Sequence, residues 1–295
     1  MNEATKWRFA LAQKIAESYA RNPNAQVVMI AGSVGRGSAD RYSDIEIDVY
    51  YAEPPAHEER IAAVEGCGGT VALLDEDEDE WEEQMLFDGF QAGSSTFLVS
   101  TMERYLSTVV DQCEIEPVAQ VRLYSLLHAV PVKGIELIEQ WRAKAASYPV
   151  GLTYAMLQEY LQFRGFWYAK DMLVARDDLL LLYDIFVQIE RQIIAALLGL
   201  NRIYLPTPTN LKWMDEMIEA MALKPTNLSA RLKQAFRSDP AQAVQSLKAI
   251  IADVLTLVET YVPDFDTTPY RANFTRIRSA WDAPLPGLNL TDMSL

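Results

Sequence analysis

Histidine and cysteine are nearly absent from this chain. Its 295 residues include two histidines, His57 and His128, and two cysteines, Cys67 and Cys113. Two histidines leave almost no material for a histidine cluster or a Ser-His-Asp relay, and two cysteines are too few for a disulfide framework or a cysteine metal site. We therefore expect free thiols in the core, and we expect carboxylates to carry any catalysis.

Basic residues are also scarce. The chain has 26 lysines and arginines against 41 aspartates and glutamates, which gives a formal net charge of −15. This charge repels the phosphate backbone of nucleic acids. We expect no nucleic-acid partner and, instead, a small acceptor molecule of cationic character.

Long apolar runs are missing as well. A strongly apolar stretch such as residues 193–198, Ile-Ile-Ala-Ala-Leu-Leu, is far shorter than the roughly 20 residues that a membrane span needs. The first residues, Met-Asn-Glu-Ala-Thr-Lys-Trp-Arg, contain no basic segment leading into an apolar one, unlike a secretory signal. We expect no membrane association and a cytoplasmic location.

The hydrophobic spacing changes character along the chain. In the first part, helical spacing alternates with short β-branched runs, whereas from about residue 101 onward the spacing is helical nearly everywhere. The pattern predicts an α+β protein with a small mixed-sheet domain over residues 1–130 and an all-helical bundle over residues 131–295. The elements expected in the first domain are helices over 5–19 and 57–65 and strands over 26–31, 45–51, 70–74 and 89–98.

An acidic run occupies residues 75–80, Asp-Glu-Asp-Glu-Asp-Glu. Such a run is usually a solvated loop. The alternative is that it provides counter-charge for a cationic substrate, and the sequence leaves both interpretations open.

A glycine-rich turn follows the first expected strand. Residues 32–37 read Gly-Ser-Val-Gly-Arg-Gly. Glycine lets the backbone approach a triphosphate closely, while backbone amides and the Ser33 hydroxyl can bind its oxygens and Arg36 can add a charge-assisted contact. No Gly-Lys-Ser/Thr follows, so this is not a Walker-type loop. The turn predicts a triphosphate site that includes Gly32.

Alternating carboxylates follow on the second expected strand. Side chains two residues apart on a strand share a face, so Asp44, Glu46 and Asp48 should project together. Carboxylates on one face repel each other, and a bound cation such as Mg²⁺ relieves that repulsion. Alternatively, the turn is only a tight connection and the acids face solvent on an edge strand, but the two features in this order favour a site. The residues between the acids, which should enter the core, are Ile45, Ile47 and Val49.

Residues 32–36, Gly-Ser-Val-Gly-Arg, and 42–46, Tyr-Ser-Asp-Ile-Glu, together resemble the signature of the DNA polymerase β-like nucleotidyltransferase superfamily. The resemblance is closest to the kanamycin nucleotidyltransferase branch of antibiotic-modifying enzymes. Leu-Gly-Leu-Asn-Arg at 198–202 is similar to a segment in the helical half of that branch. If that register holds, the resemblance places Lys170 at or next to a lysine that acts on phosphate.

The resemblance implies an activity and a set of site residues. By resemblance, Gly32, Ser33 and Arg36 bind the triphosphate, and Asp44 and Glu46 bind magnesium and are the catalytic residues. The implied reaction is the Mg²⁺-dependent transfer of a nucleoside monophosphate from a nucleoside triphosphate, with ATP expected, to an acceptor hydroxyl such as that of an aminoglycoside. Many relatives form dimers, so a homodimer is one expectation, although the sequence itself leaves the oligomeric state open.

The sequence departs from the family pattern at two places. The superfamily usually supplies a third metal-binding carboxylate from a later strand, but residues 89–97 contain none. Asp48, as a third metal ligand, or Asp88 could substitute. The branch also places a general-base glutamate where this chain has Phe166, and the neighbouring candidates are Glu159, Asp171 and Asp184.

These departures motivate a second functional hypothesis. The chain would then be a catalytically degenerate nucleotide-binding protein with a regulatory or interaction role. A protein or transfer-RNA acceptor is a third option, which the net negative charge disfavours for nucleic acid.

Overall fold

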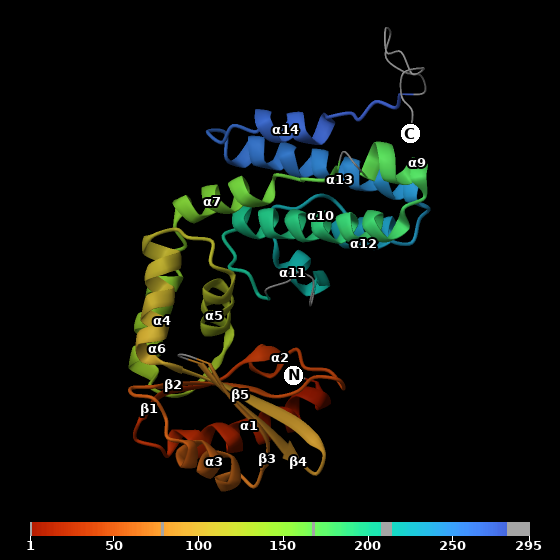
Figure 1. Ribbon diagram of the computed structural model, residues 1–295. Helices are drawn as coiled ribbons and strands as arrows, with labels where there is room; N and C mark the ends of the chain where they lie inside the picture. Colours follow the sequence, from red (N-terminus) through yellow and green to blue (C-terminus); the bar gives the residue numbers. More distant parts are fainter. Residues whose placement is uncertain (1, 78–79, 167–168, 208–213, 282–295) are drawn as a thin grey trace, which may run out of the picture. The chain divides into compact units, whose positions relative to one another are not determined.

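The computed structural model divides the chain into two compact units (Figure 1). The first runs to Met156 and includes a segment that begins at Arg202, while the second contains Leu157–Asn201 and the remainder of the chain. The domain boundary expected at residues 130/131 stays a prediction. The structure describes residues 2–77, 80–166, 169–207 and 214–281.

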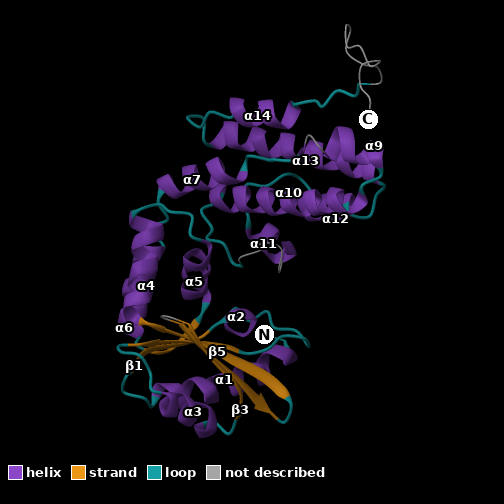
Figure 2. Cartoon of the chain, viewed as in Figure 1, coloured by secondary structure: helices purple, strands orange, loops and turns teal. Residues whose placement is uncertain are grey.

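A six-stranded mixed sheet forms the centre of the first unit, with the strand order β3-β4-β5-β2-β1-β6. β2 and β5 pair in parallel, and the other neighbours are antiparallel. Figure 2 shows these strands in the first unit and only helices in the described part of the second. The predicted α+β class, with a mixed sheet followed by a mostly helical part, is confirmed. The strands are β1 (Ala25–Ile30), β2 (Glu46–Tyr51), β3 (Thr70–Asp77), β4 (Glu80–Phe87), β5 (Phe90–Leu98) and β6 (Val130–Lys133).

Helices cover both faces of this sheet (Figure 1). α1 (Glu3–Ala20) and α3 (His57–Gly66) lie on one face, and α5 (Pro117–His128) lies on the other. The predicted core positions Ile45, Ile47 and Val49 are fully buried in the apolar cluster that α1 shares with the sheet, which confirms the alternation along β2. The remaining helices that begin in this unit are α2 (Gly32–Gly35), α4 (Val99–Leu106), the π-helix η1 (Ser107–Asp111), α6 (Ile135–Ala145) and α7 (Val150–Tyr160).

Strands β4 and β6 were not expected from the sequence. Part of the acidic run, Asp75–Asp77, continues β3, and Glu80 begins β4, so the expected loop is wrong for these residues, although Asp75–Asp77 are exposed to solvent as expected. Residues 78 and 79 lie outside the described part of the chain. β4 was not expected because its buried face carries a carboxylate, Glu83, between Trp81 and Met85. A charged residue at a buried position interrupts the alternation of apolar and polar residues that identifies a strand in a sequence.

A buried ion pair accounts for Glu83. Its carboxylate accepts hydrogen bonds from Arg60 Nε at 2.5 Å, from Thr96 Oγ1 at 2.9 Å and from the Ser94 hydroxyl. The guanidinium of Arg60 also donates to the carbonyl oxygen of Asp75 at 2.7 Å. A buried charge needs this degree of pairing, so the network fixes α3 against β3, β4 and β5.

Long apolar helices form the core of the second unit. α10 (Leu179–Leu200) and α13 (Pro240–Tyr261) bury their apolar stripes. By length and composition alone, α13 could cross a membrane, and it is the one such helix in the described residues. Eight of its side chains are buried within the protein, as in an ordinary core helix. The shorter elements are η2 (Ala169–Leu173), α9 (Val174–Arg176), α11 (Met214–Ala220), α12 (Leu228–Ala235) and α14 (Thr268–Thr275).

Candidate functional site

The glycine-rich turn brings its backbone directly against the Glu46 carboxylate. Gly32 has φ +59°, a conformation that L side chains rarely adopt, and a Cβ built on it would lie 2.1 Å from Glu46 Oε2. The amide of Ala31 donates to the carbonyl oxygen of Glu46 at 2.9 Å, which aligns the start of the turn with the start of β2. Glycine at position 32 is therefore required both by the backbone conformation and by the neighbouring carboxylate.

Among the described residues, three consecutive amides of this turn have no hydrogen-bond acceptor. The amides of Gly35 and Ser38 donate within the turn, to Ala31 at 2.8 Å and to Ser33 at 2.9 Å. In the part of the chain that the structure describes, no hydrogen bond uses the amides of Gly32, Ser33 or Val34. The first amides of a helical turn lack intrahelical partners, so these three donors are available to a ligand.

Two further residues of the turn were assigned to phosphate from the sequence. Ser33 is 8% exposed, and its hydroxyl makes no hydrogen bond to the described residues. Arg36 directly follows α2 and is partly buried. Both lie on the same short segment as Gly32, so the structure places the predicted triphosphate residues of the first unit together.

Asp44 lies just before β2 rather than on it, and it is exposed. The preceding turn is held from two sides. Asp40 Oδ1 accepts the Tyr42 amide at 2.9 Å and the Ser43 hydroxyl at 3.0 Å, and these bonds hold the pKa of Asp40 below its usual value. The buried guanidinium of Arg8 donates through Nε to the Ser43 carbonyl oxygen at 2.7 Å. Arg8 therefore positions the chain that leads into Asp44, a role that the sequence did not signal.

Asp48 shares the face of Glu46, but it is only 3% exposed and both of its oxygens have partners. Ser125 Oγ donates to Asp48 Oδ2 at 2.7 Å, and Arg122 Nη1 lies 3.7 Å from Oδ1. Burial raises the pKa of Asp48, and the charge of Arg122 and the Ser125 hydrogen bond oppose that increase. The assignment of Asp48 as a metal ligand stays a prediction.

The neighbouring strand supplies no third carboxylate. In the parallel pairing of β2 with β5, Gly93 lies beside Glu46 and Ser95 lies beside Asp48. Asp88 is exposed in the turn between β4 and β5. Among the described residues, no three His, Cys, Asp or Glu side chains are grouped so that they could hold a metal ion. The Glu46 carboxylate against the Gly32 backbone fits a cation that arrives with a triphosphate, whereas the described residues do not fit a three-carboxylate site.

Lys170 lies on η2 in the second unit. Its ammonium is 2.8 Å from Asp171 Oδ2, so the lysine has a carboxylate partner within its own unit. Phe166, where the resemblance to the kanamycin nucleotidyltransferase branch would place a glutamate, is buried, and the candidate bases Glu159 and Asp184 are exposed. The contact of Lys170 with phosphate and the identity of a general base stay predictions.

A buried carboxylate in the second unit was missed in the sequence. Glu190 is 7% exposed on α10, and burial raises its pKa to about 7. No hydrogen bond or ion pair joins it to the described residues. The signal was available, because Phe186, Glu190 and Ile193 follow the spacing of one helix face.

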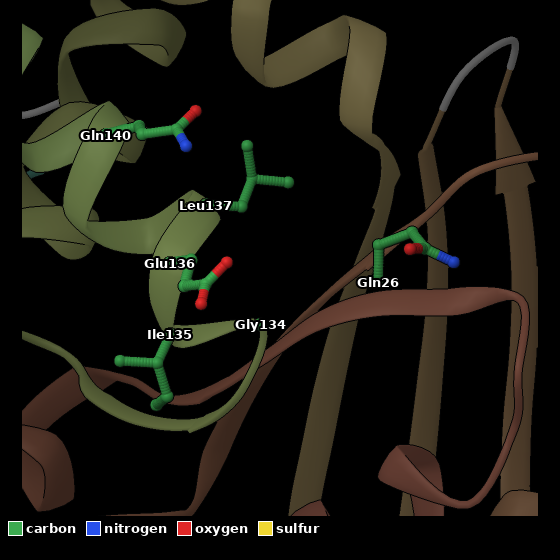
Figure 3. A pocket seen from close by; sticks show the side chains of 6 residues that line it. All are labelled: Gln26, Gly134, Ile135, Glu136, Leu137 and Gln140. Atoms are coloured by element: carbon green, nitrogen blue, oxygen red, sulfur yellow. The ribbon is translucent and has the colours of Figure 1, made fainter.

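Two pockets lie near the ends of β1 and β6, and no residue of the Gly32–Gly37 turn lines either of them. One, of about 390 Å³, places Gln26 of β1 across from residues at the start of α6 (Figure 3). The other, of about 510 Å³, lies between α1 and β6. Neither pocket includes a predicted site residue. The residues lining the first are Gln26, Gly134, Ile135, Glu136, Leu137 and Gln140.

No protein-family model matches this chain, and no curated protein matches it. Among solved structures, the chain is similar to a nucleotidyltransferase-like protein from Exiguobacterium sibiricum, with a TM-score of 0.41 and 10% sequence identity. The similarity covers 86% of this chain and 78% of the other. A likeness of this size carries no residue role from one chain to the other.

Proposed function

We propose that this protein is a Mg²⁺-dependent nucleotidyltransferase, which moves a nucleoside monophosphate from a nucleoside triphosphate to an acceptor hydroxyl. The observation that carries the proposal is the Glu46 carboxylate against the Gly32 backbone, in a turn whose first three amides have no acceptor among the described residues. Free amides suit phosphate oxygens, and a carboxylate at the same place suits the cation that accompanies a triphosphate. ATP is the expected donor.

Each site residue has a specific role in this proposal. Gly32, Ser33 and Arg36 bind and orient the triphosphate, and Asp44 and Glu46 hold the metal. Bound there, Mg²⁺ would stabilise the charge that develops on the transferred phosphate and lower the pKa of the acceptor hydroxyl. The net charge of −15 favours a small cationic acceptor, such as an aminoglycoside, and we propose that the protein acts in the cytoplasm.

Release of pyrophosphate tests the reaction. The protein is incubated with Mg²⁺ and labelled ATP, with and without a panel of aminoglycosides, and pyrophosphate and adenylated acceptor are measured. We expect release that depends on an acceptor and is lost in Glu46→Gln. The matched control is Glu82→Gln, because Glu82 is an exposed carboxylate on the same face of the sheet.

A second candidate function is nucleotide binding without turnover. It is favoured by the neutral residues Gly93 and Ser95 beside Glu46 and Asp48. Tight, Mg²⁺-dependent ATP binding without pyrophosphate release, across the whole acceptor panel, would support this second function over the first.

A further inference from the structure

The carboxylate of Asp48 is engaged by two side chains of α5. Arg122 and Ser125 are three residues apart, so they share a helix face, and both reach Asp48, through the 3.7 Å ion pair and the 2.7 Å hydrogen bond. With both oxygens engaged, Asp48 has little capacity left for a cation.

Arg122 is itself fixed in place. Its guanidinium carbon lies 4.2 Å from the centre of the Phe97 ring, and its side chain is 20% exposed. The buried Nε has no hydrogen-bond partner in the described part of the chain. Phe97 lies on β5 beside Tyr50 of β2, and Tyr50 is two residues from Asp48, so Phe97 and Asp48 share one face of the sheet. The guanidinium of Arg122, on α5, is therefore a permanent positive charge held between Phe97 and Asp48 of the sheet.

This charge lies close to the candidate cation site. Glu46 and Asp48 are two residues apart on β2, which places their backbones about 7 Å apart along the strand. A second divalent cation bound to Asp48 would lie close to the guanidinium of Arg122, which is 3.7 Å from Asp48 Oδ1. The two positive charges would repel each other. Gly93 and Ser95 on β5 offer no carboxylate to offset that repulsion.

We propose that this protein binds a single divalent cation with its nucleotide, and that Arg122, held by Asp48 and Phe97, occupies the place of a second one. The inference rests on the proposed function only for the presence of a nucleotide. Asp48 is then a positioning residue for Arg122 rather than a metal ligand. The guanidinium is part of the protein, so its positive charge does not depend on the concentration of a dissociable ion.

Counting bound Mn²⁺ tests this inference without any turnover. Free Mn²⁺ is followed by electron paramagnetic resonance, first with the protein alone and then with an equimolar α,β-methylene analogue of ATP. We expect no more than one Mn²⁺ per chain in both titrations. Glu46→Gln should weaken its binding tenfold or more, whereas Asp48→Asn should change it less than threefold. Two bound Mn²⁺ in the native protein, or equal losses in the two variants, would overturn the inference.

Variants of Arg122 separate its exclusion of a second cation from a purely structural role. Arg122→Gln should expose Asp48 and create a second, weaker Mn²⁺ site, while Arg122→Lys should keep the count at one. Thermal unfolding checks that each variant is folded. A count of one in folded Arg122→Gln would show that Arg122 does not exclude the second ion.

The proposed function can fail separately. Equilibrium dialysis with the analogue measures nucleotide binding itself. Absence of nucleotide binding would reject the proposed function, while the titration with Mn²⁺ alone would still decide between one site and two.

Discussion

Gly32 has no Cβ atom, and this allows its backbone to lie directly against the Glu46 carboxylate. The positive φ at this residue and the Glu46 oxygen beside it both exclude a side chain. Gly37 also has a positive φ, of +76°, but a Cβ there would contact nothing within 4 Å. A side chain at Gly37 would therefore strain only the backbone, whereas a side chain at Gly32 would also obstruct the site.

We expect Gly32→Ala to weaken Mg-ATP binding tenfold or more, equal to about 1.4 kcal/mol, because the methyl group displaces Glu46. Gly37→Ala should cost stability through strain, on the order of 1–3 kcal/mol, and leave nucleotide affinity unchanged. Titration calorimetry and thermal unfolding measure the two effects. Equal nucleotide affinity in both variants would contradict the role of Gly32.

The two proposed metal ligands make a second prediction. Asp44→Asn and Glu46→Gln each remove one negative charge with little change in volume. We expect each to weaken Mg²⁺-dependent ATP binding by roughly 10- to 100-fold and to leave the unfolding temperature nearly unchanged. Calorimetric titration with and without Mg²⁺ measures the effect, and Glu82→Gln is the control. Unchanged affinity in both variants would remove the metal assignment.

Glu190 predicts a pH dependence of stability. Its folded pKa, about 7, is above the ordinary 4.5, so the folded protein favours the protonated acid. The resulting penalty is absent below about pH 4.5, grows as the pH rises to about 7 and stays constant above.

Glu190→Gln removes this penalty. Between pH 4.5 and 8, we expect the unfolding free energy of the variant to gain about 2–3 kcal/mol relative to the native protein. Denaturant unfolding across this range measures the gain. Exposed Glu159 provides the control, since Glu159→Gln should show no such trend. Parallel pH profiles for native protein and Glu190→Gln would refute the prediction.

At the scale of the element, β4 depends on one buried ion pair. Arg60 and Glu83 are almost fully buried and bonded to each other, and the removal of one partner leaves the other charge unpaired. We expect Arg60→Met to lower the free energy of unfolding by about 3–5 kcal/mol. Lys144→Met is the control, because its pair with Asp111 is largely exposed and should contribute less than about 1 kcal/mol. Similar losses in chemical denaturation would argue against the importance of the buried pair.

The sequence predicted the elements whose local pattern agrees with their environment. The apolar alternation around Glu46 correctly places Ile45 and Ile47 in the core. The strand β4 was missed because Glu83 occupies a core position, and only residues distant in sequence, such as Arg60, make that position acceptable.

The same limit applies to the candidate site. The turn at Gly32 and the carboxylate at Glu46 could be predicted because a glycine-rich turn and a following strand are local features. The partners of Asp48 could not be predicted, since Ser125 is 77 residues away. Nothing in the spacing of α5 indicates which strand it covers.

At the scale of the whole molecule, the acidic balance of the chain acts on every charged ligand. A net charge of −15 repels a nucleoside triphosphate, so the nucleotide depends on local positive charge and on its own cation. Arg36 and Arg122 belong to the first unit. The resemblance adds Lys170, which lies on η2 of the second unit.

The positive charge of Lys170 gives a separate prediction. A lysine acts on phosphate as a mobile point charge that salt screens. We expect Lys170→Ala to weaken Mg-ATP binding by roughly tenfold at about 20 mM salt and clearly less at about 300 mM. Calorimetric titration at both salt concentrations measures the change.

The competing interpretation is that the ammonium of Lys170 serves only Asp171, 2.8 Å away. Lys170→Ala would then lower the stability of the helical unit, because the two side chains of the pair are only 10% and 22% exposed, and leave nucleotide affinity unchanged at both salt concentrations. Lys248 on α13 provides the matched control, because it is an exposed lysine of the same unit, and Lys248→Ala removes the same charge from the molecule. A salt-dependent loss in Lys170→Ala that is absent in Lys248→Ala would mean a local contact with phosphate, since the change in net charge is identical. Equal losses of Mg-ATP affinity in the two variants would mean that only the net charge of the protein matters, and Lys170 would then not be a site residue.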